Sequence, residues 1–189
     1  MGHVAITAGT YKLGPAAGRV SIRTSRAGIA ARAGHDLLIE VAAWSAVVTI
    51  PEEDLDEDRI AAATVTAELD IGSLTVREGT GGAKPLSPRD REDIGRTMRK
   101  LLGSGTVTFS SSRIIPSAVG GAVEGTLTFN GRTQPVRLQV QNPAPGRYRG
   151  SGPVVQTAFG ITPYTGFFGA LKLKDEVTAE FDVDFAKAA

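Results

Sequence analysis

Few side chains in this sequence could act as a catalytic base or nucleophile. The 189 residues include two histidines, His3 and His35, and no cysteine. Histidine is the usual base of a nucleophilic triad, and a cysteine thiolate is an alternative nucleophile. We expect His3 to lie in a frayed terminus, which leaves His35 as the candidate base. Its neighbour Asp36 cannot orient it along a strand, because adjacent side chains point to opposite faces.

No larger catalytic or metal-binding motif accompanies His35. The sequence has no nucleophile elbow, phosphate-binding loop, His-Glu-x-x-His motif or dinucleotide fingerprint. One histidine and scattered carboxylates also make a poor zinc site, which usually gathers three or four ligands. We therefore predict no catalytic residue, no metal and no cofactor. Two interpretations of His35 stay open: a structural residue at a strand start, held by neighbouring backbone, or a pocket residue that contacts a ligand.

The composition excludes several classes of partner. The chain carries 21 basic and 20 acidic residues, a net charge of +1, so no overall field would hold it to nucleic acid. No stretch approaches the ~18 consecutive apolar residues of a membrane span. The first residues lack the pattern of a signal peptide, and we expect a cytoplasmic protein. We also expect residues 1–9 to form a flexible N-terminus.

A β-hairpin is the most strongly predicted element. An Asn-Gly dipeptide at 130–131 separates two alternating segments, and such a dipeptide favours a two-residue turn. The turn would place Phe129 opposite Arg132 and Gly125 opposite Val136. The apolar residues of both strands then share one face, as in an antiparallel sheet with its core on one side.

Alternation of apolar and polar residues continues along most of the chain. Period-two segments occupy residues 20–24, 65–71, 107–109 and 177–185. In the segment 37–50 the apolar residues change phase, which predicts a bulge or corner near 42–44.

One α-helix is predicted over residues 87–102. Ser87 can cap it, Pro88 suits its first position, Asp90 completes a capping box and Gly103 can end it. The apolar residues follow helical spacing: Ile94, Met98, Leu101 and Leu102. A helix with one apolar stripe should lie against the sheet or cover an opening.

Two further segments are predicted to be irregular. Residues 77–85 contain three glycines and no periodicity, which indicates a mobile loop that could act as a lid. The acidic run over 52–58 indicates a solvated turn between strands.

About eight strands and one helix favour closure into an antiparallel β-barrel, because closure removes exposed sheet edges. An eight-stranded barrel is either filled by side chains or holds one small ligand, and the alternation does not distinguish these cases. The expected inner surface consists of Trp44, Phe109, Val123, Leu127, Phe129, Val136, Leu138, Val140, Phe181, Val183 and Phe185. A Gly-rich segment over 157–169 adds aromatic and aliphatic residues that would close one end of a cavity or plug the barrel: Phe159, Ile161, Tyr164, Phe167 and Phe168.

The order of these features resembles the YceI-like family of bacterial lipocalin-like barrels. The block 123–138 is similar to the family pattern Gly-x-Leu-Thr-x-x-Gly-x-Thr-x-Pro-Val, with supporting matches at 69–74, 107–111 and 158–161. The resemblance implies one domain over 10–186, an all-β closed antiparallel lipocalin-like barrel. It also implies a bound polyisoprenoid, isoprenoid quinone or fatty-acyl chain along the barrel axis, with its head near an opening that His35, Arg23 or Arg32 could reach.

The expected ligand-binding residues combine this implication with the inner surface. They are His35, Trp44, Phe109, Leu127, Phe129, Val136, Leu138, Phe159, Ile161, Phe167, Phe168, Phe181 and Val183. Many family members are exported, whereas this sequence shows no secretion signal.

Three hypotheses for function remain at this stage. The first is a non-catalytic protein that binds a hydrophobic or amphiphilic small molecule. The second is an isomerase-like or hydrolase-like barrel enzyme with His35 as its single acid or base, beside a carboxylate with a perturbed pKa. The third is a protein-interaction module with a filled core. A homodimer is compatible with each of them, and the identity of a ligand stays open.

Overall fold

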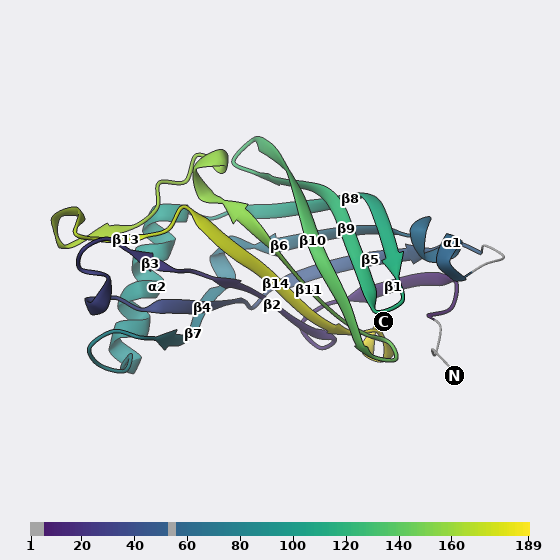
Figure 1. Ribbon diagram of the computed structural model, residues 1–189, viewed down its shortest axis with the longest axis horizontal. Coiled ribbons are helices and arrows are strands. Elements are labelled where there is room, and N and C mark those ends of the chain that lie inside the picture. Colours follow the sequence, from purple (N-terminus) through teal and green to yellow (C-terminus); the bar gives the residue numbers. More distant parts are fainter. Residues whose placement is uncertain (1–5, 53–55) are drawn as a thin grey trace.

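Antiparallel strands make up most of the computed structural model, which describes residues 6–52 and 56–189 (Figure 1). Its main sheet has eleven strands in the order β1-β5-β6-β8-β9-β10-β11-β14-β2-β4-β7. Their bounds are β1 Gly9–Leu13, β2 Gly18–Arg23, β4 Asp36–Val41, β5 Trp44–Ile50, β6 Thr64–Asp70, β7 Leu74–Thr80, β8 Thr106–Ser117, β9 Gly120–Phe129, β10 Arg132–Ala144, β11 Arg147–Val155 and β14 Glu176–Asp184.

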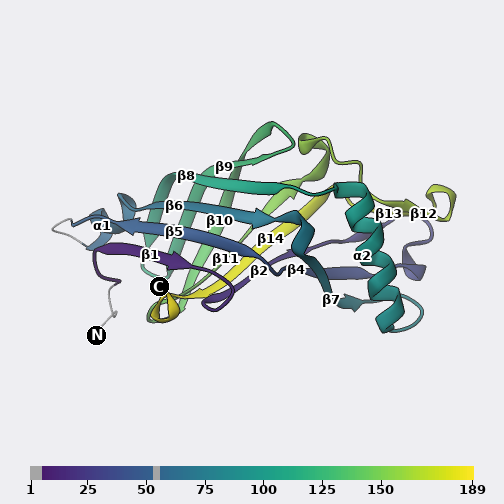
Figure 2. The same cartoon turned by 180° about the vertical axis from the view of Figure 1, so that it is seen from behind.

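A second, small sheet lies at one end of the molecule. It has the order β12-β13-β3, with bounds β12 Thr165–Gly166, β13 Leu171–Leu173 and β3 Arg26–Ala27. The described helices are α1 Asp56–Ala61 and α2 Pro88–Leu102. The small sheet and α2 lie at the end away from α1 and the C-terminus (Figure 2).

The predicted hairpin is confirmed in turn type and register. Asn130 and Gly131 have φ values of 52° and 70°, as a two-residue turn with positive φ requires. Phe129 pairs with Arg132, and Gly125 pairs with Val136. The turn therefore sets the register of β9 and β10 from local sequence alone.

The phase change near residue 42 is a corner that closes the barrel. At this corner β4 runs into β5, and β6 runs into β7 through the short turn Ile71–Ser73. The two halves stay paired on both sides of the corner, Val41 with Leu74 and Trp44 with Leu69. β1 and β2 pair with β5 and β4, the two halves of one bent strand, and so form a third bent strand. Counting each bent strand once leaves eight strands around the barrel, β1/β2, β4/β5, β6/β7, β8, β9, β10, β11 and β14. The all-β barrel class is confirmed, and the corner explains the larger count of separate strands.

The predicted helix is confirmed at both ends. The Ser87 hydroxyl accepts a hydrogen bond from the Asp90 backbone N–H at 3.2 Å, and the Asp90 carboxylate accepts one from the Ser87 backbone N–H at 2.8 Å. Gly103 ends the helix with a φ of 69°. Ile94, Met98 and Leu102 pack against the hydrophobic core. The helix therefore covers the barrel end instead of standing free in solvent.

Two predicted irregular segments differ in the structure. The acidic run, predicted as a turn, continues into α1 from residue 56, while residues 53–55 lie outside the described residues. The predicted loop over 77–85 begins four residues too early, because β7 extends to Thr80 and pairs with β4. Gly79 is an ordinary strand residue there, and a Cβ on it would lie 2.2 Å from the Leu86 side chain. Position 79 therefore requires glycine because the Leu86 side chain packs closely against it, and not because the chain forms a loop there.

Candidate functional site

The barrel encloses two adjoining cavities. The larger, which we call the outer cavity, has a volume of about 770 Å³ and lies beneath α2 and the small sheet. The smaller, the inner cavity, has a volume of about 250 Å³. Both are lined by Val20, Leu69, Leu127 and Ala179, which we call the waist. The interior is therefore hollow, with its two compartments meeting at four apolar side chains.

Aliphatic and aromatic residues from several elements form most of the outer cavity. Strands β4 and β7 contribute Leu37, Ile39 and Leu74, and α2 contributes Ile94 and Met98. The polar lining residues are Ser21, Thr24, His35, Lys84, Asp90, Asp93, Thr97, Gln156, Thr162 and Tyr164. An apolar compartment with a small number of polar groups is typical of a site for a small hydrophobic ligand.

The inner cavity lies toward the end of the barrel that carries α1, whose Ile60 lines it. Tyr148 and Phe185 line it, and their rings meet edge to face at a centroid distance of 5.4 Å. Tyr11 packs against Phe185 in the same manner at 5.3 Å. Burial raises the pKa of the Tyr148 phenol, because the charged form would lose its hydration. Its hydroxyl therefore stays neutral over the physiological range.

The structure brings most of the sequence-predicted ligand residues to these two cavities. The inner cavity is lined by Trp44, Phe109, Val136, Leu138, Phe181 and Val183. The outer cavity is lined by His35, Phe129, Phe159, Ile161 and Phe167. Leu127 lines both. The alternation of the strands thus identified the inward face correctly.

Phe168 lies outside both cavities, contrary to expectation. Its side chain is fully exposed, at 112% of the reference area, whereas Phe167 is 64% exposed and lines the outer cavity. Both residues have left-handed backbone, with φ values of 48° and 56°. Such a conformation costs about 1–2 kcal/mol per residue for a residue with a Cβ. In this turn the two successive aromatic rings therefore have different environments: Phe167 borders the outer cavity and Phe168 lies in solvent. Sequence spacing alone does not distinguish them.

The outer cavity also contains residues that were not assigned to it from the sequence. The sequence predicts that the apolar residues of β4 share one face of a strand. It does not predict that this face points into the cavity, because the phase of the alternation changes at the corner. The helical spacing of the apolar residues in α2 could have assigned Ile94 and Met98 to the cavity lining, because a helix that covers an opening must present its apolar stripe to the interior.

His35 precedes β4 and lies between the backbone of a neighbouring loop and the outer cavity. Its ring Nε2 lies 2.7 Å from the Lys84 carbonyl oxygen, to which it donates a hydrogen bond, and the ring also lines the outer cavity. Gly82 packs so closely that a Cβ there would lie 2.4 Å from the same nitrogen. His35 therefore holds the loop 81–87 beside the outer cavity, and we call the opening that this loop borders the mouth.

Neither arginine proposed to meet a ligand head lines a cavity. The Arg23 Nε donates to Glu180 at 2.7 Å on the outer wall, and Arg32 is exposed in the turn Ala31–Ala33. The cation that lines the mouth is Lys84. The outward direction of Arg23 follows from its strand, where Ile22, the residue before it, faces the interior.

The pKa of the Asp90 carboxylate, which lines the outer cavity, is shifted away from that of a general acid. Hydrogen bonds from the Ser87 hydroxyl and backbone N–H lower the pKa of Asp90, which serves the helix cap. A general acid at neutral pH needs the opposite shift. Among residues 6–52 and 56–189, no group of three or more His, Asp or Glu side chains is placed to hold a metal ion.

None of the helices in the described part of the chain is long and apolar enough to cross a membrane.

Comparison with known proteins identifies the architecture. The model of the YceI-like domain matches residues 11–185. A polyisoprenoid-binding domain from Saccharophagus degradans, implicated in plant cell wall breakdown, superposes with a TM-score of 0.52 at 12% identity, covering 94% of this chain and 97% of that one. A mutant CJ YCEI protein with a monobromobimane guest superposes with a TM-score of 0.53 at 14% identity, covering 77% and 82%. At these identities the structures show a shared fold. The comparison with curated proteins gave no match.

Proposed function

The chain belongs to the YceI-like domain family, and from this premise we propose that it is a non-catalytic protein that binds a long hydrophobic or amphiphilic molecule inside its barrel. The observation that carries the proposal is the outer cavity of about 770 Å³, which is within the range of ligand sites. A filled core would instead pack at the density of an organic crystal.

A polyisoprenoid, isoprenoid quinone or fatty-acyl chain fits the shape and chemistry of this interior. The two cavities adjoin along the barrel, so an extended chain could pass the waist into the inner cavity. Binding would be driven by burial of apolar surface at roughly 25 cal/mol per Å². A polar head would lie at the mouth, near Lys84 and Tyr164. One of the two similar structures is itself described as a polyisoprenoid-binding domain.

The residues proposed to contact the chain follow from this path. They are Phe129, Phe159, Ile161 and Phe167 in the outer cavity, Leu127 at the waist, and Trp44, Phe109, Val136, Leu138, Phe181 and Val183 in the inner cavity. His35 contributes by fastening the loop at the mouth and not by transferring a proton. We propose a single domain over 10–186.

Native mass spectrometry of protein purified from its own host tests the proposal directly. We expect a stoichiometric isoprenoid or acyl species that leaves only on denaturation, and lipid extraction would then give its class. Protein that is empty and also fails to take up an added fluorescent acyl chain would contradict the proposal.

Two substitutions test whether the ligand binds inside the barrel. Leu127→Arg buries an unpaired charge and should abolish either binding or folding. Ala179→Phe fills the waist without a charge and should weaken uptake of a long acyl probe about tenfold or more while the protein stays folded by circular dichroism. Thr126→Arg, on the exposed face of the same strand as Leu127, is the matched control and should bind normally. Normal binding by both inward variants would contradict the inward path.

A further inference from the structure

Exposed apolar side chains gather at the mouth of the outer cavity. We call Ile29, Tyr164, Phe167 and Phe168 the lip; their exposed fractions are 96%, 39%, 64% and 112%. The loops that carry them both extend from the small sheet, in which Ala27 pairs with Lys172, and the Ala30 N–H donates to the Ala170 carbonyl at 3.0 Å. Tyr164 and Phe167 also line the outer cavity. The lip is thus continuous with the interior of the barrel.

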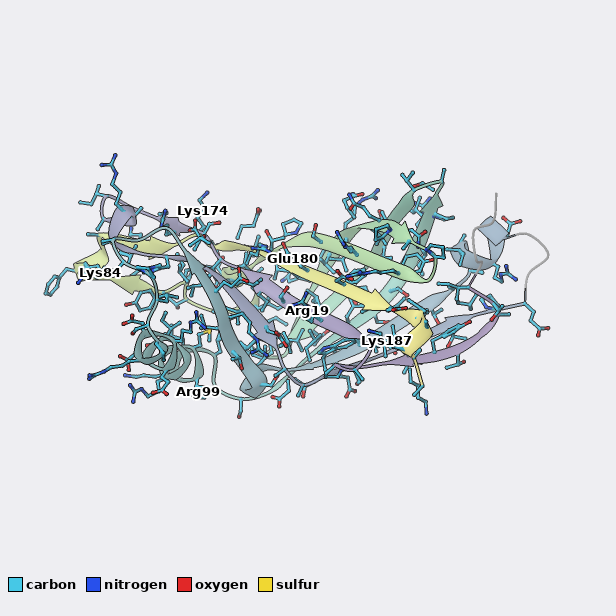
Figure 3. The ribbon with its side chains drawn as sticks, turned by 90° about the horizontal axis from the view of Figure 1, so that it is seen from below. Arg19, Lys84, Arg99, Lys174, Glu180 and Lys187 are labelled. Atoms are coloured by element: carbon cyan, nitrogen blue, oxygen red, sulfur yellow. The ribbon has the colours of Figure 1, made fainter. Side chains whose placement is uncertain are left out.

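The same two chain segments carry only positive charge. Residues 26–35 and 157–174 contain Arg26, Arg32, Lys172 and Lys174 but no Asp or Glu. The nearest carboxylates along the chain are Asp36, which pairs with Arg26, and Asp175, which accepts hydrogen bonds from Thr157. Arg32, Lys172 and Lys174 are exposed, as is Lys84 in the neighbouring loop. Lys84 and Lys174 both lie at this end of the molecule, opposite Lys187 (Figure 3).

These cations differ from several of the arginines on the barrel wall. On the wall, Arg23, Arg77 and Arg147 pair with carboxylates on neighbouring strands. Within residues 6–52 and 56–189, by contrast, none of the four exposed cations near the lip takes part in a salt bridge. Several wall arginines are therefore neutralised by carboxylates, whereas the four cations beside the apolar lip keep their positive charge, although the net charge of the chain is only +1.

We propose that the lip docks on the surface of an anionic lipid bilayer, where the barrel loads or unloads its ligand. Exposed aromatic and aliphatic side chains enter the boundary between lipid heads and tails, and adjacent cations are attracted to anionic head groups. The proposal rests on the proposed function, because a hydrophobic chain that passes from bilayer to barrel through a docked mouth avoids exposure to water. A protein partner for the lip would not require unpaired cations beside it.

Vesicle flotation tests the apolar part of the lip. Wild-type protein should bind vesicles of roughly seven parts phosphatidylcholine to three parts phosphatidylglycerol, and bind phosphatidylcholine alone much more weakly. The double variant Ile29→Asn/Phe168→Asn should lose about tenfold or more of that affinity. Asparagine tolerates the left-handed backbone at 168. The control is Val119→Asn, which removes a 76% exposed valine in the turn between β8 and β9, far from α2, and should bind as wild type.

A charge variant tests the contribution of the exposed cations beside the lip. Arg32→Gln/Lys172→Gln should weaken vesicle binding by about fivefold for each cation removed, and raised salt should have a similar effect on wild type. The control Lys12→Gln/Lys187→Gln removes two cations near the opposite end and should leave binding unchanged.

Uptake of a fluorescent acyl probe from vesicle-free solution separates this proposal from the proposed function. Neither Ile29 nor Phe168 lines a cavity, so their double variant should bind the dissolved probe normally but extract it from vesicles more slowly. Wild type that binds dissolved probe without binding anionic vesicles would overturn bilayer docking and leave the carrier function standing. Wild type that binds vesicles through the lip but never takes up the probe would support docking and contradict the carrier function.

Discussion

At the mouth of the barrel, two residues have a strained backbone and a third holds a loop through a hydrogen bond. Phe167 and Phe168 have left-handed backbone, and His35 donates a hydrogen bond to the loop that borders the cavity. Sequences retain such strain where function requires a particular side-chain direction. For Phe168 that direction is outward, into solvent or, as we propose, into a lipid surface.

Phe168→Gly should raise the free energy of unfolding by about 1 kcal/mol. Glycine adopts a φ of 56° without the clash of a Cβ, and the exposed ring makes no buried contact to lose. Urea denaturation measures the change. Phe168→Ala is the matched control, because it removes the ring but keeps the Cβ and should gain little. Equal stability of the two variants would show that the backbone is not strained at this position.

Asp182 should make stability depend on acid pH. A bidentate contact with Arg147, at 2.8 and 2.9 Å, lowers its pKa, with weaker contributions from Arg149 and Arg19. Because the folded pKa lies below the unfolded value of about 3.9, the contribution is present above pH 4 and is lost as pH falls through the folded pKa.

Asp182→Asn should therefore cost about 1 kcal/mol of stability at neutral pH, and little once the wild-type carboxyl is protonated as well. Chemical denaturation of both proteins across this pH range measures the difference. A difference that stays constant from neutral to strongly acid pH would contradict the ion-pair assignment.

Among the secondary structure elements, α2 connects local sequence to the site. Its cap at Ser87 comes directly after the loop that His35 fastens, and its apolar stripe covers the outer cavity. The helix packs on the end of a barrel instead of within a bundle, so it depends more on its own cap than a buried helix would.

Ser87→Ala should lower stability by about 1 kcal/mol, because the Asp90 backbone N–H loses its acceptor. If α2 covers the ligand, the same variant should also release a bound acyl probe faster. Thermal unfolding and stopped-flow fluorescence provide the two measurements. Ser104→Ala, just beyond the other end of the helix, is the control and should change neither.

In the whole molecule, the barrel holds two cavities that meet at a waist. The outer cavity is about three times the volume of the inner one, at about 770 and 250 Å³. A ligand that fills only the outer cavity need not pass Leu127, whereas a longer chain must. On the binding path that we propose, the waist therefore determines which chain lengths gain the full hydrophobic contribution.

Leu127→Trp should discriminate between acyl chains by length. Narrowing the waist by one large ring should weaken binding of a chain long enough to enter the inner cavity by about tenfold, the effect of leaving two methylene groups unburied. A short chain should bind as before. Titration of a series of saturated acyl probes measures this, with Thr126→Trp on the outer face as control. Equal loss for all lengths would contradict the two-compartment path.

The sequence by itself determined the elements that depend on short-range chemistry. The turn at 130–131 set a hairpin register because only certain residues adopt positive φ, and Ser87, Pro88 and Asp90 set the start of α2 because they satisfy its free backbone groups. Period-two alternation likewise identified the inward residues of β9, β10 and β14, since it reports which face of a strand is dry.

Only the tertiary structure decided what the inward residues enclose. Alternation is the same for a filled and a hollow barrel, and the difference lies in how far apart opposite walls stand, which depends on the corner at residue 42 and on the helix over the opening. The lip likewise depends on pairing between β3 and β13, which lie about 145 residues apart in the chain. Distances between segments so remote in sequence are set by closure of the whole sheet, and no local pattern contains them.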